Sequence, residues 1–116
     1  MVLIVDDDEG IRESLADILS DHGYPIATAA NGRDALEWLR AQSAPPRAIL
    51  LDLMMPVMDG WQAMEAIERE RLVTRDRIIV ITAQRDARVP PGVEAIKKPM
   101  TAATVLEAIA RRPAVD

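Results

Sequence analysis

The sequence predicts an α/β fold in which a parallel five-stranded sheet is covered by helices on both faces. Residues 48–51 and 78–81 are apolar runs without polar alternation, which is typical of strands buried on both faces of a parallel sheet. Three further apolar runs, 2–5, 25–29 and 93–96, alternate with segments whose apolar residues recur at helical spacing. This alternation implies right-handed crossovers and a doubly wound sheet.

The first half of the chain is predicted to form two strand–helix pairs. Residues 2–5 give a strand, and the helical spacing that follows ends at Gly23, a residue type that commonly stops helices. Residues 25–29 form a weaker strand, whose proline suits a sheet edge, and Asn31 can cap the next helix. The expected inward-facing residues are Ile11, Leu15, Ile18 and Leu19 in the first helix and Ala35, Leu36 and Leu39 in the second.

The second half begins after a proline-rich break. A buried strand then ends at Asp52, Asp59 can cap the following helix, and residues 78–82 form the second doubly buried strand. Residues 93–96 form a short last strand, and Thr101 can cap the final helix. The expected inward-facing residues are Ala63, Met64 and Ile67 in the helix after Asp59 and Ala102, Leu106 and Ile109 in the final helix.

Composition limits the classes of function. The 116 residues suit one domain, and no apolar run approaches the ~20 residues that a membrane helix needs. The first apolar residues lack a basic leader, so no secretory signal is expected and we expect a cytoplasmic protein. Because the chain has no cysteine, disulfides, thiolate metal sites and cysteine nucleophiles are excluded. The net charge of -5 argues against direct nucleic-acid binding, which requires a basic face.

Five polar residues lie at or just past the ends of different apolar strands: Asp6, Asp7, Asp52, Thr82 and Lys98. The carboxyl ends of parallel strands share one edge of a sheet, so these side chains should converge. Taken alone, an aspartate at a strand end can simply accept hydrogen bonds from loop amides. Three close carboxylates, however, need a compensating cation, and oxygen ligands without histidine or cysteine suit Mg²⁺. A lysine and a hydroxyl beside them can bind phosphoryl oxygens while a carboxylate acts as the nucleophile.

Four motifs occur in a recognisable order: an acidic pair after the first strand, the stretch Asp-Leu-Met-Met-Pro-Val-Met-Asp-Gly at 52–60, Thr82-Ala83, and Lys98-Pro99. In these motifs the chain resembles the receiver domain of two-component response regulators. The resemblance covers the chain from its first residues to the final helix, so we assign residues 1–116 to one receiver domain. It implies a flavodoxin-like fold with strand order 2-1-3-4-5 and a cis peptide bond before Pro99.

The resemblance also implies roles for individual residues. Asp52 would accept a phosphoryl group from a phosphohistidine on a histidine kinase or a histidine phosphotransfer domain. Thr82 and Lys98 would contact that group, and Asp8 would cap a helix. Mg²⁺ would be held by Asp6 or Asp7, with Asp7 as the first assignment, together with Asp52 and the main-chain carbonyl of Met54.

Two departures from the family pattern concern the output side of the domain. Only residues 84–92 separate Thr82-Ala83 from the last strand, and Pro90-Pro91-Gly92 leaves room for about one helical turn, so a fourth helix should be vestigial. In the family, the last strand usually carries an aromatic residue three positions before the lysine, and this residue swings inward when the threonine turns toward the phosphoryl group. Ala95 occupies that position here and has no rotamer to switch. These departures keep a second interpretation open, a pseudo-receiver that binds a partner without phosphorylation. A metal-dependent phosphatase is a third, for which no second catalytic acid is found.

Overall fold

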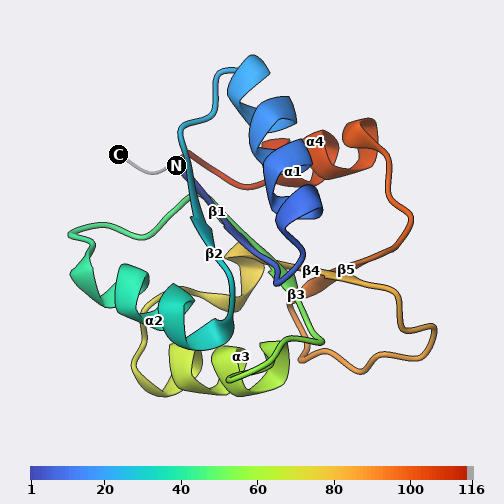
Figure 1. Cartoon of the computed structure of the whole chain (residues 1–116). Coiled ribbons are helices and arrows are strands. Elements are labelled where there is room, and N and C mark those ends of the chain that lie inside the picture. The colour runs from blue at the N-terminus through green and yellow to red at the C-terminus, as the bar shows by residue number, and fades with distance from the viewer. Residues whose placement is uncertain (115–116) are drawn as a thin grey trace.

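The computed structural model describes residues 1–114, which form five parallel strands in one sheet (Figure 1). The strands lie in the order β2-β1-β3-β4-β5, so the predicted doubly wound topology is confirmed. Strands β1 and β3 pair in the centre, with Val5 opposite Leu51. The strand bounds are β1 (Val2–Val5), β2 (Ile26–Ala29), β3 (Ala48–Asp52), β4 (Ile78–Thr82) and β5 (Glu94–Lys97).

Helices cover both faces of the sheet, two on each side (Figure 1). Helices α1 (Glu9–Asp21) and α4 (Ala102–Ala110) pack on one face, and α2 (Gly32–Ala41) and α3 (Gly60–Arg69) pack on the other. A short 3₁₀ helix, η1 (Arg75–Arg77), precedes β4. Each α-helix begins at a capping side chain that accepts a hydrogen bond from a main-chain amide, and the four caps are the expected Asp8, Asn31, Asp59 and Thr101.

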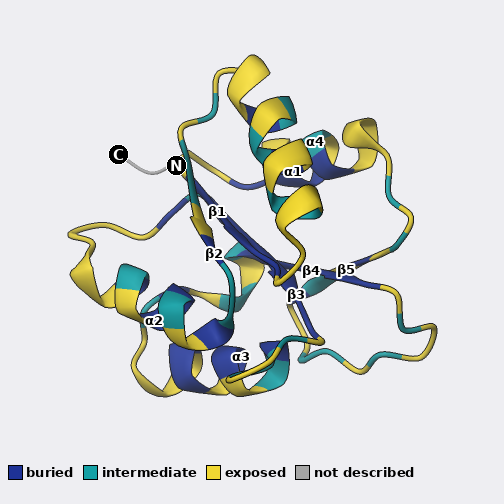
Figure 2. Ribbon diagram, viewed as in Figure 1, coloured by how far each residue is buried: buried dark blue, intermediate teal, exposed yellow. Residues whose placement is uncertain are grey.

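The core has two parts, one on each side of the sheet, because strand side chains alternate between its faces. Leu3 and Val5 of β1 face α2 and α3, whereas Val2 and Ile4 face α1 and α4. Every residue of β1, β3 and β4 is buried, as expected for strands covered on both sides. Figure 2 shows this as a buried sheet between helices whose outer surfaces are exposed.

The expected inward-facing residues are confirmed for α2 and α3, and only in part for α1 and α4. Residues Ala35, Leu36, Leu39, Ala63, Met64 and Ile67 are buried as expected. In α1, Leu15 and Leu19 are buried, while Ile11 and Ile18 are half-buried. In α4, however, Ala102 is exposed and Leu106 half-buried, and the buried residues are Val105, Ala108 and Ile109. This helix is apolar on more than one side, so its spacing alone does not select the buried face.

Two strand boundaries differ from expectation. Strand β2 begins at Ile26 and β5 runs from Glu94 to Lys97, a shift of one residue in each case. The expected loss of the fourth helix is confirmed, because residues 83–93, all of which the structure describes, form turns and extended chain without a helix. Figure 1 shows this crossover as an open loop between β4 and β5. The final helix is therefore α4.

Candidate functional site

Three carboxylates meet at the carboxyl end of the two central strands. Asp6 directly follows β1, and Asp52 is the last residue of the neighbouring β3. Oxygen atoms of Asp6, Asp7 and Asp52 all lie within 4.8 Å of one another. Asp6 and Asp52 are buried, whereas Asp7 is exposed, so the group opens to solvent on the Asp7 side. The predicted convergence of these three residues is confirmed.

Lys98 places its ammonium group against two of these carboxylates. Its Nζ lies 3.2 Å from Asp6 Oδ2 and 3.6 Å from Asp52 Oδ1. The Lys98 side chain is 19% exposed and those of Asp6 and Asp52 are 5% and 9% exposed, so the pairs are largely shielded from water. The peptide bond from Lys98 to Pro99 is cis, as the resemblance implies. One lysine therefore balances part of the negative charge.

The turn after β1 is fixed by bonds that hold Asp6 in place. Asp6 Oδ1 accepts a hydrogen bond from the Asp8 main-chain amide at 2.9 Å, while Asp8 caps α1. Arg12 Nη1 donates to the main-chain oxygen of Asp6 at 2.7 Å from the second turn of α1. Backbone and side chain of Asp6 are thus both anchored, which orients the carboxylate before any ligand binds. The bond from Arg12 depends on the folded turn and was not predicted.

Burial raises the pKa of Asp52 above its usual range, and the neighbouring negative charge of Asp6 raises it further. Lys98 and a backbone hydrogen bond from Met54 lower this pKa, and the charge of Asp7 adds a smaller increase. The raised pKa means that the ionised carboxylate is held in a site that does not fully compensate its charge. An additional cation near Asp52 would relieve this imbalance.

Thr82 lies beside Asp52 on the next strand. Asp52 pairs with Ile81, so Thr82 is one residue further toward the same edge, and it is 2% exposed. Thr82 Oγ1 accepts a hydrogen bond from the Gln84 amide at 3.0 Å. Gln84 Nε2 lies 3.3 Å from the sulfur of Met54, whose side chain is exposed. Thr82 is therefore buried beside Asp52, and Gln84 links it to the exposed Met54 side chain.

Gly60 lets α3 begin directly against the β3 end. Its amide donates to the Leu53 oxygen at 2.9 Å. A Cβ atom at position 60 would lie 2.5 Å from the main-chain oxygen of Asp52 and 2.8 Å from Leu53 Cα, both too close for a side-chain carbon. Glycine is thus required here by close approach to backbone, and the position of Asp52 depends on it. The motif contained this glycine, but its contact could not be seen from the sequence.

The donor set fits a hard divalent cation. Carboxylate oxygens are the ligands that Mg²⁺ prefers, and three of them gather here with one lysine as internal counter-charge. The open side at Asp7 leaves access for water and for a phosphoryl group. Arranged in this way, the residues suit phosphoryl chemistry, in which charge balance and positioning supply most of the catalysis.

Comparison with known proteins identifies the family. The family model described as response regulator receiver domain matches residues 2–110. The chain belongs to this family. Receiver domains are phospho-accepting modules of two-component systems. No helix among residues 1–114 is both long and apolar enough to cross a membrane.

Proteins similar to this receiver domain include a longer response regulator and a chemotaxis protein of solved structure. It is 38% identical over 86 residues to the response regulator MprA of Mycolicibacterium vanbaalenii, an alignment covering 74% of this chain and 35% of MprA. It therefore spans about a third of the length of that curated relative. Chemotaxis protein CheY4 of Vibrio cholerae is 30% identical, with 97% of both chains covered and a TM-score of 0.80.

A third similar protein is the response regulator TrrA of Thermotoga maritima, whose structure is a complex with Mg²⁺ and BeF. It is 29% identical to this receiver domain, with a TM-score of 0.81 and 95% and 96% of the two chains covered.

Proposed function

We propose that this receiver domain accepts a phosphoryl group on Asp52 from a phosphohistidine of a histidine kinase or a histidine phosphotransfer domain, in a reaction that needs Mg²⁺. The observation that carries the proposal is the setting of Asp52. It is a buried carboxylate with a raised pKa, flanked by Asp6 and by the Lys98 ammonium group. The proposal includes a cytoplasmic location, as expected from the sequence.

In the proposed transfer, an oxygen of Asp52 attacks the phosphorus atom. The bond from phosphorus to the donor imidazole nitrogen breaks, and its electron pair passes to that nitrogen. Lys98 and the Thr82 hydroxyl bind oxygens of the transferred group, and the Lys98 charge offsets the charge that the group brings. Bound Mg²⁺ would neutralise charge on the phosphoryl oxygens; its ligands would be Asp6, Asp7, Asp52 and the Met54 carbonyl.

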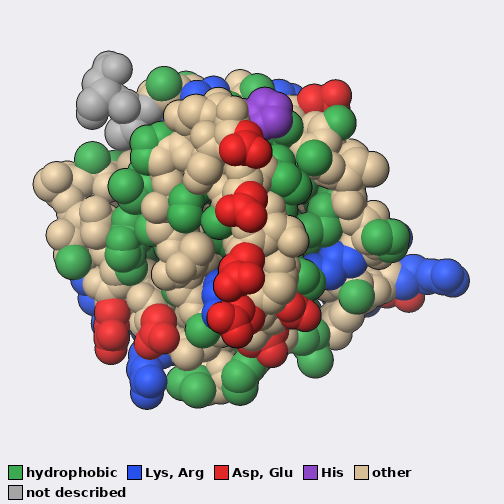
Figure 3. Space-filling model, turned by 45° about the horizontal axis from the view of Figure 1, so that its top comes forward, with side chains coloured by type: hydrophobic (Ala, Val, Ile, Leu, Met, Phe, Trp, Pro, Cys, Tyr) green, Lys and Arg blue, Asp and Glu red, His purple; other side chains and the backbone are tan. Residues whose placement is uncertain are grey.

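The exposed surface of α1 is acidic, and this favours a phosphoryl donor whose own surface is basic. Glu9, Glu13, Asp17 and Asp21 recur every four residues along the helix and are exposed. Figure 3 shows acidic side chains in a row over this helix. Like charges at this spacing destabilise a helix slightly, so the row is not explained by helix stability. A positively charged donor would be attracted to this side of the site.

Incubation with Mg²⁺ and acetyl phosphate tests the proposal without a cognate kinase. Mass spectrometry should show one added phosphoryl group, located on Asp52 and absent from Asp52→Asn. Lys98→Ala and Thr82→Ala should impair the transfer. The absence of a mass gain would favour the pseudo-receiver, which binds a partner without phosphorylation, and repeated release of phosphate would favour a phosphatase. Label on another residue of the wild-type chain would contradict the assignment of Asp52.

The metal assignment has its own test. The assembled site exists only in the folded chain, so millimolar Mg²⁺ should raise the thermal midpoint. Asp7→Asn should reduce that rise, because Asp7 lies on the open side of the cluster and is the first-choice ligand. Exposed Asp17, outside the cluster, gives the matched control Asp17→Asn. If both variants respond to Mg²⁺ like the wild type, Asp7 is not a ligand.

A further inference from the structure

Arg12 reaches from α1 back to the segment that carries two of the three clustered carboxylates. Its Nη1 donates a hydrogen bond of 2.7 Å to the main-chain oxygen of Asp6. Helix side chains point toward the amino end of their helix, so Arg12 can reach the turn that precedes α1. The bond therefore ties α1 to the end of β1, where Asp6 and Asp7 are attached.

Arg12 makes this bond although its part of the sequence is rich in acidic residues. It is the only lysine or arginine among residues 1–32, which contain seven aspartates and glutamates. Within residues 1–114, no ion pair includes Arg12. The charges that shift the pKa of Asp52 are those of Asp6, Lys98 and Asp7, and Arg12 is not among them. These observations favour an action of Arg12 on the backbone over the role of a counter-charge.

The bonded oxygen belongs to the peptide unit that joins Asp6 to Asp7. This unit is planar, so a hydrogen bond to its oxygen restricts both flanking Cα atoms, from which the two carboxylates extend. The Asp6 carboxylate is also held directly, because its Oδ1 accepts from the Asp8 amide at 2.9 Å. Asp7 is exposed, so fewer contacts hold its carboxylate, and the orientation of the peptide matters most for this residue.

We propose that Arg12 is a positioning residue that sets the affinity of the site for Mg²⁺ by fixing the peptide between Asp6 and Asp7. The proposal rests on the metal assignment made above, since Asp6 and Asp7 are two of the proposed ligands. Mg²⁺ demands nearly ideal octahedral geometry and tolerates displaced ligands poorly. Groups that orient metal ligands typically contribute about 10–100-fold to metal affinity. We expect the lower end, about tenfold, because Asp52 keeps its place at the end of β3 without Arg12.

The affinity for Mg²⁺ alone tests the proposal. Arg12→Met removes the donor but keeps a long aliphatic side chain, and ¹⁵N-¹H NMR titration of the folded domain with MgCl₂ should show a dissociation constant about tenfold higher. The amides of Asp8 and Met54 report the binding. Arg12→Lys keeps a cationic donor and should restore most of the loss. The control Arg69→Met removes the same charge at an exposed residue in the last turn of α3, and it should bind Mg²⁺ like the wild type.

Phosphorylation by acetyl phosphate separates positioning from a direct role in the transfer. Arg12→Met should need about tenfold more Mg²⁺ for its half-maximal labelling rate. At saturating Mg²⁺ its rate should approach that of the wild type, because Arg12 bonds to backbone and not to the acceptor Asp52. Circular dichroism without Mg²⁺ checks the fold, and Arg12→Gln, with a shorter polar side chain, replaces Arg12→Met in both measurements if the latter does not fold.

Each outcome bears on a different part of the proposal. Equal Mg²⁺ affinity in Arg12→Met and the wild type would overturn the role of Arg12 and leave the metal site intact. An equal loss of affinity in Arg69→Met would assign the effect to net charge, and a labelling rate that stays low at saturating Mg²⁺ would place Arg12 in the transfer step; both results contradict positioning. If the wild type itself does not respond to Mg²⁺, the metal assignment fails together with this proposal.

Discussion

Replacing Lys98 by methionine should destabilise the domain by about 3 kcal/mol in the absence of divalent cations. The Lys98 ammonium lies 3.2 Å from one Asp6 oxygen and 3.6 Å from one Asp52 oxygen, and all three side chains are mostly buried. Methionine preserves much of the aliphatic stem but removes the charge. The carboxylates then face one another without an internal cation, and their mutual repulsion is no longer offset.

The magnitude follows from those distances. At an effective dielectric constant of about 20, each of the two pairs contributes about 5 kcal/mol of attraction before desolvation is counted. Burial of the lysine offsets much of this, and loss of one partner of a buried pair typically costs 3–5 kcal/mol. We take the lower end because water reaches the cluster from the side of exposed Asp7. With an unfolding entropy of about 0.24 kcal/mol/K for 116 residues, the thermal midpoint should fall by about 12 °C.

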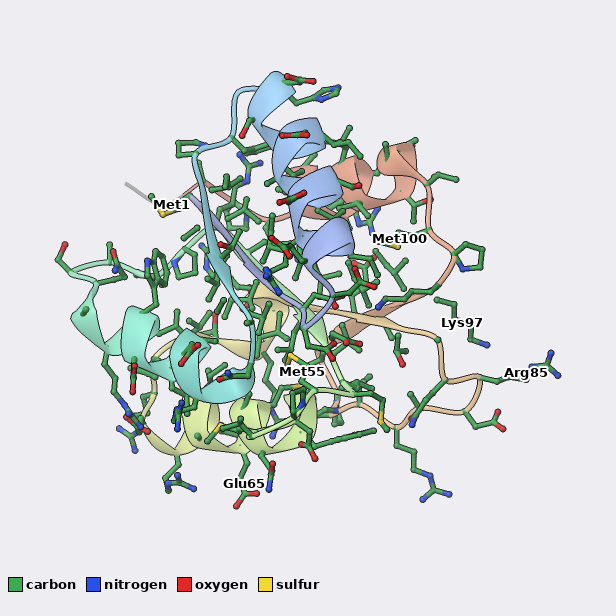
Figure 4. All side chains as sticks on the ribbon, in the orientation of Figure 1. Met1, Met55, Glu65, Arg85, Lys97 and Met100 are labelled. Carbon is green, nitrogen blue, oxygen red and sulfur yellow. The ribbon has the colours of Figure 1, made fainter. Side chains whose placement is uncertain are left out.

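Thermal and urea unfolding of the variant measure the loss directly. The matched control is Lys97→Met, which makes the same change at the adjacent residue; Lys97 is exposed and projects into solvent in Figure 4. The control should stay within about 0.5 kcal/mol of the wild type. Mg²⁺ should restore more stability to Lys98→Met than it adds to the wild type, because the cluster has lost its own cation. If the two lysine variants lose equal stability, Lys98 does not neutralise the cluster.

Four further predictions test the surroundings of the site and the opposite end of the sheet. Arg112→Met should lower the free energy of unfolding by about 2–3 kcal/mol, because this buried guanidinium bonds to Glu94 and to two main-chain oxygens. The control Arg111→Met, at an exposed residue, should lower it by less than about 1 kcal/mol. Equal losses of stability in urea unfolding would contradict this prediction. Burial raises the pKa of Glu94, but bonds from Arg112 and Arg111 outweigh burial and lower it below its ordinary 4.5. As the pH falls, the unfolded chain therefore takes up the proton before the folded chain does. The difference in unfolding free energy between wild type and Glu94→Gln should be largest at neutral pH and should disappear as the pH falls from about 5 through the folded pKa. A difference that stays constant across that range would refute this prediction. Gly60→Ala should cost about 1–3 kcal/mol and slow labelling of the acceptor by acetyl phosphate, because the new carbon meets backbone; unchanged unfolding and labelling would show that the loop yields. Gln84→Ala should slow loss of the phosphoryl group about tenfold if its amide orients the attacking water, and a change under about twofold in the decay of labelled protein would exclude that role.

The sequence was sufficient for the fold and for the group of charged residues at the sheet edge. Uninterrupted apolar runs identified β3 and β4, because strands buried on both faces leave no place for polar residues. Once the strands are parallel, Asp6, Asp52 and Lys98 must lie at one edge, whatever the details of the loops. The helix caps were equally local, since a capping side chain bonds to an amide two or three residues away.

Features that depend on contacts between distant segments were not predicted. The apolar residues of α4 did not reveal which side meets the sheet: Ala102 was wrongly placed inward, and Leu106 is only partly buried against the core. Arg112 follows that helix, and arginine is a residue type that usually lies on the surface, yet its exposed fraction is only 7%. It is buried because Glu94 and the main-chain oxygens of Asp76 and Ala108 satisfy its donors, and two of these three partners lie at least 18 residues away.

Lys97 and Lys98 show why a motif can locate a site more accurately than charge or periodicity. Both residues lie at the end of β5, and their charge is the same, yet only Lys98 turns toward the carboxylates. The pairing of lysine with Pro99 in the family motif fixed the assignment.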